Sequence, residues 1–216
     1  LEAGLRTGNK FDPFPEEMNR KLTTQLADFH FAPTKLSKEN LIREGVPENK
    51  IWITGNSVID ALFATLKKIE SAGLLHGIES SFVKQGLDLK RDQFVLITGH
   101  RRESFGPDFE NICSAIRRLA IVNASVKFVY AVHLNPNVQE PVKKHLSGIA
   151  NVHLLPPLNY DEFVVLLKAC FLVMTDSGGI QEEAPSLGKP TLIMRNVTER
   201  PEGVAAGTSI LLGKKE

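Results

Sequence analysis

The sequence predicts a doubly wound α/β fold, in which helices cover both faces of a parallel sheet. From residue 94 onward, short apolar stretches alternate with segments of helical periodicity, which is the pattern of successive βαβ units. These stretches also lack the polar alternation of a half-exposed strand. Strands that are apolar throughout are buried on both faces, as they are in parallel sheets.

Residues 1–54 predict a smaller unit that precedes this alternation of strands and helices. Pro15, followed by Glu16 and Glu17, indicates the start of a helix that runs to about Ala27. Thr34 is the predicted N-cap of the next helix. The remaining elements expected here are strands over 29–32 and 51–54 and a helix over 37–44.

A helical pattern over 58–69 follows Gly55, and the segment 71–90 is helical only in part. We expect residues 1–55 to belong to a first domain and residues 56–216 to a second. The strands expected in the second domain are 94–98, 126–132, 152–155, 171–175, 191–194 and 209–212. Its expected helices are 109–122, 138–146, 160–168, 180–187 and 201–206.

The composition is that of an ordinary globular chain. The 216 residues carry a net charge of +1, which gives no reason to expect nucleic acid or an acidic membrane surface as a partner. Cys113 and Cys170 have neither the number nor the spacing of a disulfide framework or a metal site, and they fit a reducing, cytoplasmic setting. No apolar run approaches the roughly 20 residues of a membrane span, and no signal peptide is recognised. Because the chain starts without Met, we expect a piece of a longer protein.

Polar residues follow several expected strands at their carboxyl ends. His100 follows strand 94–98, His133 follows 126–132, and Arg200 comes shortly after 191–194. In an open α/β sheet the ligand lies outside the carboxyl ends of the strands. These residues therefore predict a functional site at one edge of the sheet.

The stretch TDSGGIQEEAPSLGKP, residues 175–190, joins an apolar strand to a short helix through small residues. Glycines and the free amides of a helix start form a cradle for an anion. A nucleotide fits the neighbouring acids, with phosphates at residues 177–179 and a carboxylate further along on the ribose hydroxyls. The alternative is a plain strand-to-helix turn with acids that favour the helix dipole.

Several common fingerprints are absent from the sequence. No GxGxxG follows a strand, and Gly188-Lys189 is followed by Pro190, so it is not a Walker loop. Ser177 lies in DSGG, which is not the GxSxG elbow of a hydrolase. No His, Cys or Asp spacing indicates a metal site.

The motifs EAGLRTG, PEEMNR, ITGNSVIDAL, TGHRRESFG, VHLNPNV, TDSGGIQEEAPSLGKP and TERPE occur in this order. Together they resemble the non-hydrolysing UDP-N-acetylglucosamine 2-epimerases of bacteria and archaea, over essentially the whole chain. The resemblance implies a GT-B architecture of two Rossmann-like domains, with the first domain present in part. It also implies interconversion of UDP-GlcNAc and UDP-ManNAc without NAD or metal, through elimination of UDP, a 2-acetamidoglucal and re-addition.

The resemblance also assigns roles to residues. Glu2, Glu16 and His100 match catalytic positions. Substrate-binding positions are matched by Arg20, His133, Phe163, Ser177, Gly178, Gly179, Glu183 and Arg200. Arg101 and Glu103 fall where bacterial members bind a second, regulatory UDP-GlcNAc, and a homodimer is expected from the family. Leu158 departs from the pattern, because some bacterial members have a polar residue there that touches the base.

Other functions compatible with the sequence remain. A glycosyltransferase of the same architecture would share the nucleotide-binding glutamate but would need an acceptor site. A non-catalytic module that binds UDP-sugars would share the nucleotide site alone. Each site residue could also have a purely structural role. Glu2 and Glu16 could be surface acids, Phe163 could belong to the core, and the arginines could be solvated or salt-bridged.

Overall fold

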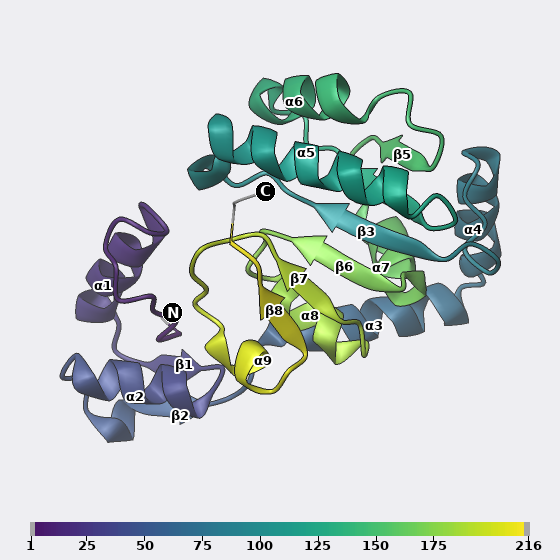
Figure 1. The fold of residues 1–216 in the computed structure, drawn as a ribbon. Helices are drawn as coiled ribbons and strands as arrows, with labels where there is room; N and C mark the ends of the chain where they lie inside the picture. The colour runs from purple at the N-terminus through teal and green to yellow at the C-terminus, as the bar shows by residue number, and fades with distance from the viewer. Residues whose placement is uncertain (1–2, 214–216) are drawn as a thin grey trace.

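The protein is described by a computed structural model over residues 3–213, apart from the side chain of Glu103. The larger part is a six-stranded, wholly parallel sheet with strand order β5-β4-β3-β6-β7-β8 (Figure 1). A smaller part near the N-terminus holds a two-stranded parallel sheet, β1-β2. The predicted parallel, doubly wound α/β class is confirmed. The strands are β1 (His30–Ala32), β2 (Ile51–Ile53), β3 (Phe94–Thr98), β4 (Lys127–Ala131), β5 (Val152–Leu155), β6 (Leu172–Thr175), β7 (Thr191–Ile193) and β8 (Ser209–Leu211).

Most helices lie within two residues of the predicted bounds. The exception is the segment 71–90, whose weak pattern conceals a ten-residue helix, α4. The α-helices are α1 (Glu16–Leu26), α2 (Lys35–Arg43), α3 (Ser57–Ser71), α4 (Leu75–Lys84), α5 (Pro107–Val122), α6 (Pro136–Leu146), α7 (Tyr160–Ala169), α8 (Ile180–Ser186) and α9 (Pro201–Ala205). Two 3-10 turns, η1 (Glu48–Lys50) and η2 (Arg102–Ser104), complete the elements.

Helices cover both faces of the large sheet. Figure 1 shows α5 and α6 together over one face, with α3, α7 and α8 over the other. Strand β3 explains why the pattern is apolar throughout, since all five of its residues are buried. Val95 and Ile97 join the core cluster formed with α5 and α6, whereas Phe94 and Leu96 join the cluster formed with α4, α7 and α8.

Local capping signals fix several helix starts. The Thr34 side chain accepts a hydrogen bond from the Ser37 amide, as its predicted role requires. Asn159 and Glu162 form a capping box at the start of α7. Helix α6 begins two residues before the predicted position, because Asn135 caps it ahead of a proline in the first turn.

The structure also describes the surroundings of the two cysteines and the apolar character of the helices. Cys113 and Cys170 are both buried and neither is in a disulfide. Burial raises the pKa of each thiol to about 12. Across residues 3–213, no helix has the length and apolar character needed to cross a bilayer.

Candidate functional site

The candidate site lies where the strand order of the large sheet reverses. Strand β3 comes first in this part of the chain, and it pairs with β4 on one side and with β6 on the other. Connections therefore leave β3 and β6 in opposite directions, which opens a crevice at their carboxyl ends. The segments at this crevice are residues 99–101, after β3, and residues 176–179, after β6.

Asp176 ties these two segments together. Its Oδ2 accepts hydrogen bonds from the backbone amides of His100 and Arg101, each at 2.8 Å. The side chain is almost wholly buried, so the bonds are shielded from water. At the last residues of β3 and β6, the hydroxyl groups of Thr98 and Thr175 lie 2.7 Å apart. The segment that carries His100 is thus fixed relative to the segment that carries Ser177.

The segment after β3 is also held from its other side. The Tyr130 hydroxyl of β4 donates a hydrogen bond of 2.9 Å to the carbonyl oxygen of Gly99. A Cβ at position 99 would lie 2.9 Å from that hydroxyl oxygen, so only glycine fits without a shift of Tyr130. The close approach explains a glycine directly before the histidine.

The two histidines predicted at this edge lie beside each other. The rings of His100 and His133 stack, with centroids 5.2 Å apart and an angle of 14° between their planes. His133 Nδ1 accepts a hydrogen bond from the Asn135 amide at 3.1 Å, which orients its ring. Both side chains are exposed, so both rings are accessible to a ligand at the rim.

Two arginines approach the glycine segment. A Cβ built on Gly178 would lie 2.6 Å from Arg200 Nη1 and 3.4 Å from Arg101 Nη2. Arg200 Nε is hydrogen-bonded to Glu182 of α8, so its guanidinium is oriented by the protein. Backbone amides with two guanidiniums at one glycine suit the recognition of a phosphate-type anion. Glu182 thus holds this arginine at the glycine segment.

A buried carboxylate, Glu199, lies behind the arginines. It forms ion pairs with Arg195 at 2.9 Å, Arg20 at 3.3 Å and Arg200 at 3.7 Å. Burial alone would raise the pKa of Glu199, but these cations and a backbone hydrogen bond lower the pKa to about 2. Glu199 is therefore ionised at neutral pH.

Glu183 lies on α8, one helical turn beyond Gly179. It is 5% exposed, and its Oε1 accepts a hydrogen bond of 2.7 Å from the Tyr160 hydroxyl. Burial and then this hydrogen bond raise the pKa of Tyr160. Phe163, one turn into α7, is partly buried and packs against the core cluster that includes α4, α7 and α8.

The acidic residues of the N-terminal part differ in their surroundings. Glu2 lies outside the described residues. Glu16 is the first residue of α1 and is exposed, whereas its neighbour Glu17 is fully buried. Glu17 accepts hydrogen bonds from the amides of Thr7 and Gly8, each at 3.1 Å, and so holds the glycine-rich N-terminal segment against α1.

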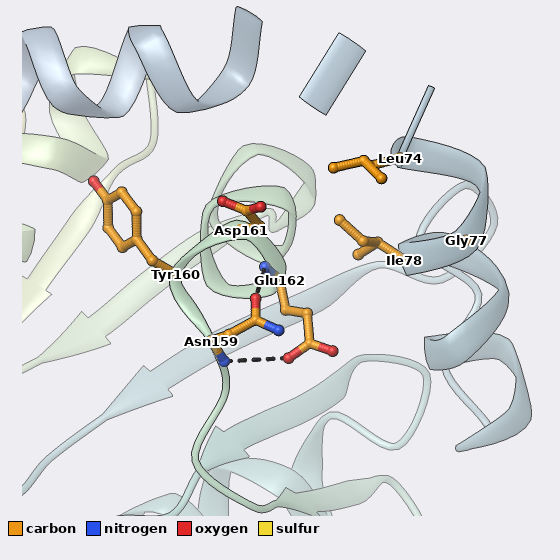
Figure 2. A pocket seen from close by; sticks show the side chains of 7 residues that line it. All are labelled: Leu74, Gly77, Ile78, Asn159, Tyr160, Asp161 and Glu162. Carbon is orange, nitrogen blue, oxygen red and sulfur yellow. Dashed lines mark hydrogen bonds between the residues drawn. The ribbon is translucent and has the colours of Figure 1, made fainter. Parts of the chain in front are cut away.

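A pocket of about 470 Å³ lies between α4 and the start of α7, and Tyr160 is one of its lining residues (Figure 2). Figure 2 shows the apolar side chains of Leu74 and Ile78 across from the capping box of Asn159 and Glu162. We place the site at the crevice, because the Asn159 and Glu162 side chains of this pocket cap α7 and Asp161 pairs with Lys68. Within residues 3–213, no group of three or more His, Cys, Asp or Glu side chains has the arrangement of a metal site.

The sequence did not single out four residues of the crevice and its surroundings: Asp176 as the acceptor for two amides, Glu199 as the centre of three arginines, Tyr160 as the donor to Glu183, and Glu17 as the buried acid of α1. A signal existed only for Glu199, since it stands between Arg195 and Arg200 in the run that follows β7. The hydrogen bonds of the other three join segments that are separated in sequence.

The fold and the site together define the class of protein to which this domain belongs. A six-stranded parallel sheet of this order, with glycines and arginines at its switch point, is a Rossmann-like domain suited to an anionic, nucleotide-like ligand. The family model for UDP-N-acetylglucosamine 2-epimerase matches residues 1–216. The chain belongs to this family, and its solved members have the GT-B architecture that the motifs predict.

Individual relatives agree with this assignment. The chain is 54% identical over 213 residues to a probable UDP-N-acetylglucosamine 2-epimerase of Ralstonia solanacearum, covering 99% of this chain and 56% of the relative. It is 53% identical to the UDP-N-acetylglucosamine 2-epimerase of Yersinia pestis, with the same coverage. The crystal structure of the Neisseria meningitidis enzyme bound to UDP-GlcNAc matches with a TM-score of 0.95 and 47% identity, over 100% of this chain and 57% of that one. The chain thus spans little more than half the length of these relatives.

Proposed function

We propose that this chain, with the segments that complete its relatives, interconverts UDP-GlcNAc and UDP-ManNAc. The observation that carries the proposal is the convergence of Arg200 and Arg101 on Gly178 at the switch point of the sheet. A diphosphate placed there would meet backbone amides and guanidiniums, which stabilise the charge of a departing UDP. Family membership over the whole chain, and relatives solved with UDP-GlcNAc, support this ligand.

The proposed reaction is an elimination followed by an addition. A base removes the proton from carbon 2 of the sugar, and the bond from carbon 1 to the diphosphate oxygen breaks with its electron pair on UDP. The resulting 2-acetamidoglucal has a double bond between carbons 1 and 2. Return of a proton to the opposite face of carbon 2, with UDP to carbon 1, gives the epimer.

The proposed roles follow the family positions. Glu2, Glu16 and His100 transfer protons or act beside the sugar. Residues 177–179 hold the diphosphate, Arg200 contacts the nucleotide, and Arg20 lies beside the carboxylates Glu2 and Glu16. Glu183 takes the ribose hydroxyls, in place of or beside its bond from Tyr160. Phe163 and His133 line the uracil and nucleotide sides.

The proposal includes the domain organisation. Residues 1–55 are the end of a first Rossmann-like domain and residues 56–216 most of a second, which the two separate sheets support.

Regulation, assembly and location also belong to the proposal. Arg101 and Glu103 contribute to a regulatory site for a second UDP-GlcNAc. The protein acts as a homodimer in the cytoplasm. Sedimentation of the complete protein would measure its oligomeric state, and UDP-GlcNAc titrations of rate would detect activation.

The decisive experiment uses the full-length protein in D₂O with UDP-GlcNAc, followed by NMR at carbon 2. Deuterium at carbon 2 together with UDP-ManNAc is the expected result. Transfer of the sugar to an acceptor without exchange would instead support a glycosyltransferase. Binding of UDP-GlcNAc with neither exchange nor transfer would support a non-catalytic module.

A further inference from the structure

Glu199 is a buried carboxylate shared by arginines from two distant parts of the chain. Arg20 comes from α1 in the N-terminal part, whereas Arg195 and Arg200 come from the segment after β7. Its side chain has no exposed surface, and that of Arg195 is 1% exposed. A buried charge needs such partners, because its desolvation is costly.

The cluster depends on the single negative charge at its centre. Three guanidiniums within 3.7 Å of one carboxylate would repel one another without it. Arg200 has a second partner in Glu182, and Glu182 also accepts a hydrogen bond of 2.8 Å from Asn56 Nδ2 at the start of α3. Arg20 differs, since Glu199 is its ion-pair partner in the large domain.

The position of Arg20 on α1 makes this contact relevant to the chemistry. Residues four apart lie on the same face of a helix, so Arg20 and Glu16 share one face of α1. A bond that fixes Arg20 against the segment after β7 therefore also fixes the face that carries Glu16. Glu199 itself is a poor base, because its pKa is about 2.

We propose that Glu199 is a positioning residue, whose carboxylate clamps Arg20 of α1 to the segment after β7 and so holds Glu16 at a set distance from residues 177–179. This inference rests on the proposed function. The clamp consists of the protein's own charged groups, so it contributes to the preorganisation of the site. Misplacement of a reacting group by about 1 Å costs roughly 10²-fold in rate.

The test uses Glu199→Asp in the full-length enzyme. The shorter carboxylate keeps the buried charge beside Arg195, which is four residues away in sequence, but it no longer spans to Arg20. We expect kcat to fall by roughly 10²-fold, with less than about a threefold change in KM because Glu182 still orients Arg200. Glu202→Gln, which removes a charge three residues along, is the matched control and is expected to keep the wild-type rate.

A double-mutant cycle separates positioning from a general loss of structure. If Glu199 acts through Arg20, then Glu199→Asp combined with Arg20→Gln is no slower than Arg20→Gln alone. Losses that multiply, or a kcat of Glu199→Asp within twofold of the wild type, would overturn the inference. If Glu199→Asp does not fold, Arg20→Gln alone is measured, and a kcat within twofold of the wild type would overturn the inference. A wild-type enzyme that shows no exchange at carbon 2 would refute the proposed function instead.

Discussion

The hydroxyl group of Tyr160, the first residue of α7, donates a hydrogen bond of 2.7 Å to Glu183 of α8. The contact joins the two helices that flank the proposed nucleotide side of the crevice. Because Glu183 is buried, its carboxylate needs a donor when no ligand is present. A ribose that binds at Glu183 would supply such donors.

The variant Tyr160→Phe is therefore expected to lower the free energy of unfolding by about 1 kcal/mol, since a buried acceptor loses its donor. Urea denaturation of the full-length protein measures this difference. Saturating UDP should shrink it, because the ribose hydroxyls would satisfy Glu183. An equal difference with and without UDP would contradict the placement of the ribose at this carboxylate.

The variant Gly178→Ala is expected to weaken UDP binding about tenfold, or by roughly 1.4 kcal/mol. The new methyl group would lie 2.6 Å from Arg200 Nη1, and Arg200 is tied to Glu182 and cannot move freely. Calorimetric titration with UDP measures the effect. Gly77→Ala, in the first turn of α4, is the control, because its Cβ would meet no atom within 4 Å. Equal UDP affinity in both variants would show that Arg200 is not needed at the diphosphate.

The variant Asp176→Ala should free the segment that carries His100. It removes the acceptor of two backbone amides, and we expect a loss of about 2 kcal/mol in unfolding free energy together with a lower kcat. Asp176→Asn keeps one acceptor oxygen and should lose less of both. Denaturation and steady-state rates measure the pair. Wild-type turnover in Asp176→Ala would show that the position of His100 does not depend on this anchor.

Glu199 predicts a specific pH dependence of stability. Its folded-state pKa is lowered from 4.5 to about 2, so the unfolded state binds the proton more tightly. The stabilisation by Glu199 is complete above about pH 4.5 and is lost as the pH falls toward about 2, with a total on the order of a few kcal/mol. The difference in unfolding free energy between wild type and Glu199→Gln should therefore shrink from pH 6 to pH 3. A constant difference would mean that the pKa of Glu199 is the same in the folded and unfolded states.

The fold was predictable because its signals are local. The apolar run of β3 and the capping residues Thr34 and Asn159 each depend on neighbours in sequence. The bounds of β6 and α7 shifted by a single residue from the predicted ones. Helix α4 was the least evident element, because only Phe82 of its ten residues is buried and its pattern is correspondingly weak.

The sequence predicted where the site residues lie in the fold, but it did not predict which side chains they contact. His100, His133 and Arg200 all follow strands, and the parallel sheet brings strand ends to one edge. The sequence could not show that Glu182 holds Arg200, or that Glu17 rather than Glu16 is buried. Those facts depend on which way side chains turn after the elements pack. The roles of the site residues stay predictions.

Tyr130 and Asp176 restrain residues 99–101 from two sides, one through the carbonyl of Gly99 and the other through the amides that follow it. An insertion or deletion within these residues would break at least one of those bonds. Changes of loop length are therefore confined to the stretch after Arg101, before α5 begins at Pro107. Diversification of this rim can lengthen or shorten that stretch while the imidazole of His100 stays in place.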